Sequence, residues 1–215
     1  MTTRDTENLI GALSADVRPV KPLAGPISRA LRYLAFAAPC LLAIALFYGP
    51  SEMFLARLDQ PVFMVPWLAS VLTGILATVA VFHLSVPGAP RWIYLLPIPP
   101  LAVWLGTLGA GCLGELVAHG FSHIGTSWHC VMVILQTSIP LGLVLGWMLR
   151  KAAPLAPVAT GAWAALAVAA FASATLETFH SLDTATMILL WHGTAVAAVA
   201  AIGAVTGKRA LRLPV

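Results

Sequence analysis

A stretch near the middle of this sequence is rich in side chains that bind soft or borderline metals and respond to oxidants. Its members are Cys112, Glu115, His119, His123, His129 and Cys130. Imidazole, thiolate and carboxylate groups together suit Zn²⁺ or another soft divalent metal. No pair forms a strong ligand motif, because Gly120 weakens the helix that would place His119 and His123 on one face. A metal or redox site and hydrogen-bonded interfacial histidines are therefore both open.

The composition requires that this stretch be positioned by a membrane protein. Of 215 residues, 60% are hydrophobic and only 9% are charged, whereas soluble proteins contain roughly 25% charged residues. A membrane span needs about 20 apolar residues. Six such spans can be placed, at 31–48, 62–85, 92–111, 127–149, 158–179 and 186–206. We expect an all-α bundle of six transmembrane helices, with Pro97, Pro99 and Pro100 kinking or unwinding the third.

The distribution of charge predicts how the bundle is oriented. With the N-terminus inside, eleven of the twelve Lys and Arg residues lie on the cytoplasmic side and only Arg57 lies outside. This satisfies the positive-inside rule and places both termini in the cytoplasm. The basic residues sit at span ends, so the positive net charge sets orientation and does not indicate direct nucleic-acid binding. The histidine-rich stretch then lies at the outer face, near His180 and Asp183.

The chain divides into a cytoplasmic tail (1–30), a transmembrane sensor domain (31–207) and a basic cytoplasmic tail (208–215). The first tail is polar and of mixed charge, unlike a signal peptide. Leu9, Ile10, Leu13 and Val17 recur at spacings that place them on one face of a short helix. This stripe must be buried against membrane lipid or a partner. Since the helical stretch is nearly neutral and lipid-binding helices are usually basic, a protein partner is favoured.

Cys130 is the best candidate for a reactive thiol. It lies in the first turn of the fourth span, where the helix N-terminus favours the thiolate form of a cysteine. Cys40 lies inside a span, where a cysteine acts as a small apolar residue. Cys112 is the remaining candidate.

Several other functions are disfavoured. A haem site needs histidines at matching depth on facing spans, and His83 and His192 lie near opposite membrane faces. An ion-coupled transporter usually carries charged groups at the midplane, where none occurs here, although a small-molecule or metal-ion transporter stays open as the alternative function. We see no nucleophile–base arrangement, so the protein is not expected to be an enzyme or to require a cofactor.

Two segments resemble a known family. The opening 7–23, Glu-Asn-Leu-Ile-Gly-Ala-Leu-Ser-Ala-Asp-Val-Arg-Pro-Val-Lys-Pro-Leu, resembles the N-terminal signature of the NrsF-like six-span membrane anti-sigma factors. The segment 126–130, Thr-Ser-Trp-His-Cys, resembles that family's motif at the start of its fourth span. Pro140, the 150–154 turn and Trp191-His-Gly193 fit as well, so the resemblance runs nearly from end to end.

The resemblance implies a stress-response regulator of transcription in the bacterial inner membrane. Its tail, through Leu9, Ile10, Leu13, Val17 and Val20, would sequester an extracytoplasmic-function sigma factor. A periplasmic heavy-metal or oxidative signal would release that sigma factor. The resemblance leaves open whether the protein forms a homo-oligomer.

The resemblance also assigns the sensor. Cys130 matches the family's first cysteine, whereas the second position reads Ser181, which cannot form a disulfide. Cys112 could take its place, or His129, His180 and Cys130 could share zinc or another soft metal.

Overall fold

The computed structural model describes residues 3–15, 22–119, 128–152, 154, 156–179, 194 and 201. Every regular element within these residues is helical, which confirms the predicted class. In chain order the elements are α1 (Thr3–Ala15), α2 (Pro26–Tyr48), α3 (Glu52–Ala56), α4 (Pro61–Leu84), the 3₁₀ helix η1 (Arg91–Leu95), α5 (Ile98–His119), α6 (Trp128–Arg150) and α7 (Pro157–Phe179).

Five stretches of the described chain are long and apolar enough to cross a membrane, namely Pro26–Tyr48, Pro61–Leu84, Arg91–Ala118, Met132–Arg150 and Pro157–Phe179. Each corresponds to one of the first five predicted spans. The sixth predicted span, 186–206, lies almost wholly outside the described residues. Membrane insertion follows from these helices, because a bilayer core about 30 Å thick requires helices of this length with their backbone groups satisfied internally.

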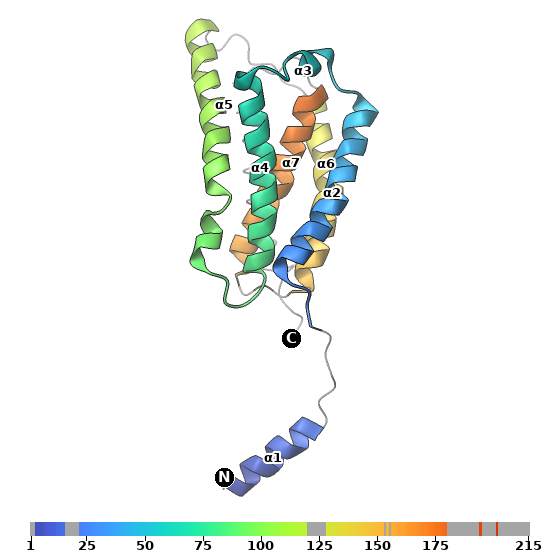
Figure 1. Ribbon diagram of the computed structural model, residues 1–215, viewed down its shortest axis with the longest axis vertical. Coiled ribbons are helices and arrows are strands. Elements are labelled where there is room, and N and C mark those ends of the chain that lie inside the picture. The colour runs from blue at the N-terminus through green and yellow to red at the C-terminus, as the bar shows by residue number, and fades with distance from the viewer. Residues whose placement is uncertain are drawn as a thin grey trace.

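The helices run up and down through the bundle (Figure 1). We call the end where α2 begins the tail end and the opposite end the far end. Helix α7 is the central element: every residue from Ala165 to Glu177 is buried, and α7 packs against α4, α6 and α2. Its alanine-rich composition permits such close packing, as is usual for helices in lipid. A small residue also permits close packing on α4, where Gly74 leaves room for the ring of Phe171.

The predicted third span is broken, as the prolines indicate, but it also extends further than predicted. It comprises η1, a turn at Leu96 and Pro97, and then α5. Helix α5 continues as far as His119, so the predicted end of the third span at 111 was wrong. The apolar residues Leu113, Leu116 and Val117 extend the helix, and no proline interrupts it.

The beginning of the bundle also differs from the prediction. Helix α2 starts at Pro26, earlier than the predicted 31. Proline is favoured in the first turn of a helix, because its fixed φ suits the helix and it lacks an N–H that would be unpaired there. This places Arg29 inside α2 rather than in the tail. A short helix, α3, occupies the predicted loop between the first two spans, with Ser51 capping it through a 3.0 Å bond from the Phe54 N–H.

Candidate functional site

The N-terminal helix α1 presents an uncovered apolar stripe. Leu9, Ile10 and Leu13 are 47%, 60% and 63% exposed, and all residues from Arg4 to Ala15 are exposed. Figure 1 shows α1 outside the bundle, beyond the tail end. A helix of 13 residues is marginal alone in water. The described part of the bundle thus leaves this apolar stripe uncovered. Val17 and Val20, predicted to extend this stripe, lie outside the described residues.

The tail leads directly into a buried arginine. Arg29 lies in the first turn of α2 and is only 4% exposed. Its Nη1 donates to Ser85 Oγ at the end of α4, and its Nη2 donates to the Met148 carbonyl near the end of α6, both at 2.9 Å. The guanidinium also lies 4.7 Å from the centre of the Phe82 ring. Arg29 therefore joins three helices at the tail end.

Tyr33, one turn further along α2, strengthens this contact. Its side chain is fully buried. The hydroxyl donates to the Leu141 carbonyl of α6 at 3.4 Å, and the ring lies 6.4 Å from that of Phe82. We call Arg29, Tyr33, Phe82, Ser85 and the Met148 carbonyl the tail-end joint. A buried cation that donates hydrogen bonds to separate helices is costly to rearrange. If one acceptor is lost, part of the buried charge is left without a partner.

A second set of contacts holds the other end of α2. The Tyr48 hydroxyl donates to Gln136 Oε1 of α6 at 2.8 Å, and the Tyr48 ring stacks on Phe179 of α7 at 4.7 Å. Just beyond α2, the Ser51 N–H donates to the Thr178 carbonyl at 3.0 Å. We call Tyr48, Gln136, Phe179, Ser51 and Thr178 the far-end joint. It attaches α2 to the two helices that lead to the predicted sensor residues.

The predicted sensor residues are only partly described. Cys112, Glu115 and His119 fall on α5, and His129 and Cys130 fall in the first turn of α6. Cys112 is half-buried, while the side chains of the other four lie outside what the structure describes. His123, His180, Ser181 and Asp183 lie wholly outside it. Their roles as sensor or metal ligands therefore remain predictions.

The packing bears on which sensor residues can meet. Helix α5, with Cys112, packs on α4 and η1, whereas α6, with Cys130, packs on α7 and α2. Figure 1 shows α4 and α7 between these two helices. Within the described part of the chain, no group of three His, Cys, Asp or Glu side chains is placed to hold a metal. Glu177, near the far end of α7, is buried, with 8% of its surface exposed.

Most polar residues within the spans form hydrogen bonds inside their own helices. Thr73, Thr78 and Thr137 are fully buried, and each donates its hydroxyl to the carbonyl four residues earlier, at 2.7–2.8 Å. Serine and threonine commonly form this bond inside helices. These groups therefore do not favour the transporter alternative.

The two joints were missed by the sequence analysis. Arg29 was counted only as a charge that sets orientation, although Arg29, Ala30, Tyr33 and Ala37 recur at helical spacing and are the buried residues of α2. That periodicity was the available signal. Tyr48 lies where the first span ends, and only the tertiary structure shows its partners.

A family model described as NrsF, negative regulator of sigma F, matches residues 13–213, which is nearly the whole chain. The match begins within α1, at Leu13. No curated protein and no solved structure is significantly similar to this chain.

Proposed function

Because this chain belongs to the NrsF family of negative regulators of sigma F, we propose that it is a membrane anti-sigma factor that sequesters an extracytoplasmic-function sigma factor through its N-terminal tail. The observation that carries this proposal is the uncovered stripe of Leu9, Ile10 and Leu13 on α1. Helices that bind through such a stripe place their apolar face in a hydrophobic groove of the partner. A sigma factor held in this way at the membrane is kept from RNA polymerase.

The proposed orientation places the tail end on the cytoplasmic side of a bacterial inner membrane. The helix ends and turns at this end carry Arg29, Arg32, Arg91, Arg150 and Lys151, whereas Arg57 is the basic residue of the loop at the far end. An excess of Lys and Arg in short loops marks the cytoplasmic side. The far end, with Cys130, then faces the periplasm, where a heavy metal or oxidant would act.

Helix α2 is the proposed route from the signal to the sigma factor. Gln136 lies six residues after Cys130 on α6, and Phe179 directly precedes His180. Both hold Tyr48 at the far end of α2, while Arg29 holds the tail end of the same helix. A signal that shifts α6 or α7 would thus move α2, to which the tail is attached. Such a switch requires two packings of the bundle with different affinities for the signal.

Co-purification with the extracytoplasmic-function sigma factors of its own genome tests the sequestration. The intact chain should retain one sigma factor. A triple variant with Leu9, Ile10 and Leu13 changed to Asp should lose it, because three carboxylates cannot enter an apolar groove.

A matched control adds the same charge to the other side of α1. It carries Asp at Asn8, Ala12 and Ala15, which lie away from the stripe, and should retain the sigma factor. Loss of binding in both triple variants would show that added charge alone disrupts the tail. If the intact chain retains no sigma factor, the proposal is wrong.

The proposed sensor is tested separately. In the bound complex, Cys130→Ser should prevent release by Cd²⁺, Zn²⁺ or peroxide, whereas Cys40→Ser should not, since Cys40 lies within α2. Release that is unchanged in Cys130→Ser would reject Cys130 as the sensor and leave sigma binding intact.

A further inference from the structure

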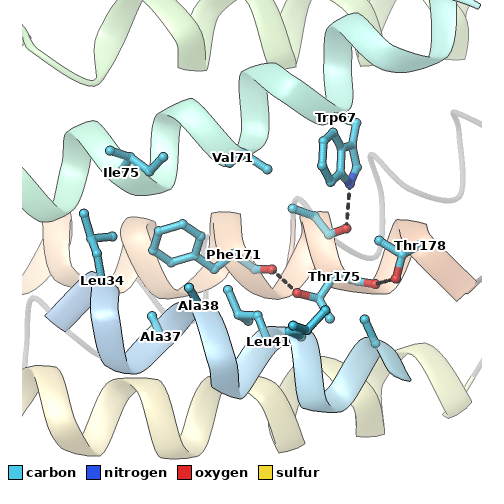
Figure 2. Close-up of a pocket in the computed structure, with 13 residues that line it drawn as sticks. Leu34, Ala37, Ala38, Leu41, Trp67, Val71, Ile75, Phe171, Thr175 and Thr178 are labelled. Atoms are coloured by element: carbon cyan, nitrogen blue, oxygen red, sulfur yellow. Dashed lines mark hydrogen bonds between the residues drawn. The ribbon is translucent and has the colours of Figure 1, made fainter. Parts of the chain in front are cut away.

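A groove on the side of the bundle lies apart from the tail-end joint and shares Thr178 with the far-end joint. It lies between α2 and α4, with α7 as its floor, and encloses about 410 Å³. Figure 2 shows Leu34, Ala38 and Leu41 of α2 on one side and Val71 and Ile75 of α4 on the other. The walls belong to three membrane-crossing helices, so the medium beside the groove is hydrocarbon.

The polar groups of the groove leave no hydrogen-bond donor for a ligand. Trp67 Nε1 donates to the Ala174 carbonyl at 2.9 Å (Figure 2). Thr175 Oγ1 donates to the Phe171 carbonyl at 2.9 Å, and Thr178 Oγ1 donates to the Thr175 carbonyl at 2.7 Å. These three side chains are the polar ones among those that line the groove. The acceptor groups of a polar ligand would lose their hydrogen bonds on entry, so an apolar occupant fits the groove better.

The floor of the groove is too deeply buried to receive another helix. Phe171, Ala174 and Thr175 are only 4–5% exposed, although they line the groove. A helix is about 10–12 Å wide and needs an open face about 8–10 Å from the axis of its neighbour. A hydrocarbon chain is narrower, because carbon atoms pack at about 3.5–4.0 Å. A hydrocarbon chain therefore fits this groove better than a helix of a second copy does.

The depth of the groove matches one leaflet of a bilayer. From Trp67 to Ile75 the groove follows α4 for eight residues, or about 12 Å, while one leaflet contributes about half of the roughly 30 Å core. Next to its far end, Phe54 of α3 lies edge-on to Trp67 at 5.9 Å and to Phe63 at 5.7 Å. Tryptophan favours the level of the lipid headgroups, and Trp67 marks that level here.

We propose that this groove binds one acyl chain of a phospholipid from the leaflet at the far end, with the headgroup at the level of Phe54, Phe63 and Trp67. The chain descends between α2 and α4 and contacts Phe171 at the floor. This inference requires membrane insertion but not sigma binding, so it stands or falls independently of the anti-sigma proposal.

Photolabelling of the full chain tests the site. The protein is reconstituted in vesicles of phosphatidylethanolamine and phosphatidylglycerol with a trace of phosphatidylcholine that carries a diazirine in the middle of one acyl chain. After irradiation, lipid adducts are located by peptide mass spectrometry. Adducts should concentrate at Ala38, Leu41 and Val71 beyond those at Leu143, which is 70% exposed on α6. Adducts that simply follow exposure would overturn the proposal.

Matched substitutions on α2 separate groove binding from general contact with lipid. Ala38 lines the groove, whereas Ala43 is equally an exposed alanine of α2 but points away from it. Ala38→Phe should reduce the adducts at Leu41 and Val71 severalfold, and Ala43→Phe should leave them unchanged. Should Ala38→Phe fail to fold, Leu42→Trp, which fills the same groove from an exposed position, takes its place.

Two results would refute this assignment. Undiminished adducts at Leu41 and Val71 in the groove-filled variants would show that no chain binds between α2 and α4. The second result is a homodimer, counted by single-molecule photobleaching, that Ala38→Phe disrupts while the adducts are retained. It would assign the surface to a second copy.

Discussion

The glycine in the tail helix offers a sharp test of how the tail binds. Gly11 lies on the side of α1 turned away from Leu9, Ile10 and Leu13. A Cβ added there would meet no atom within 4 Å. Gly11→Ala therefore changes the stability of the helix without touching the apolar stripe. It should strengthen sigma binding.

The size of the effect follows from helix propensity. Glycine inside a helix costs about 0.8–1.0 kcal/mol relative to alanine. A free helix of 13 residues is marginal, so most of the ordering cost falls on the binding step. Since about 1.4 kcal/mol corresponds to a tenfold change in Kd, Gly11→Ala should lower the Kd about four- to fivefold.

The assay uses the full chain in nanodiscs and its sigma factor carrying a fluorescent label, with Kd read from anisotropy. Ala12→Gly provides the reciprocal change and should weaken binding by a similar factor. The exchange of both residues, Gly11→Ala with Ala12→Gly, keeps the composition and should return the Kd to that of the natural chain.

Two outcomes would refute the reasoning. If Gly11→Ala and Ala12→Gly both leave the Kd unchanged, the tail does not fold into a helix on binding. If Gly11→Ala weakens binding, the partner packs against the face of α1 that we regard as solvent-exposed.

Other substitutions test the bundle. Gly74→Ala places a Cβ 2.7 Å from the Phe171 ring and should destabilise the protein by about 1–3 kcal/mol, seen as a lower Tm in detergent; Phe171→Leu in the same chain should recover part of the loss. Arg29→Met removes two hydrogen bonds from a cationic donor, each worth about 1.5–3 kcal/mol. It should lower the Tm and release sigma factor without a signal. Sigma binding at the natural level would argue against the tail-end joint as part of the switch. Tyr48→Phe keeps the stacking on Phe179 but loses the bond to α6, at a cost of about 1 kcal/mol; a signal response equal to that of the natural chain would remove the far-end joint from the proposed route.

Much of the fold was predictable because membrane helices are specified locally. Apolar length alone located the first five spans, and the fifth was placed at 158–179 against Pro157–Phe179 in the structure. Prolines marked the break in the third span, since proline cannot donate to the helix ladder. The prediction failed where a polar or mixed stretch continues a helix. Residues 112–119 were placed beyond the end of the third span, but Leu113, Leu116 and Val117 keep α5 helical to His119.

Of the candidate site, the exposed apolar stripe of α1 was the part that the sequence could predict. The stripe of Leu9, Ile10 and Leu13 is a periodic pattern on one short segment, so its existence needs no tertiary contact. The sensor residues were recognisable by type, but whether Cys130, His129 and His180 meet depends on packing that no local pattern encodes.

Local patterns were enough to predict an all-helical membrane bundle with an amphipathic tail, because hydropathy, proline positions and helical period act over a few residues at a time. The contacts of Arg29, Tyr48 and Phe171, in contrast, could be learned only from the folded bundle. Arg29 joins Ser85 and Met148 from 56 and 119 residues away, and the groove above Phe171 is lined by residues of three helices. Contacts between residues so far apart arise from how helices pack, and packing depends on the shapes of all the facing side chains together.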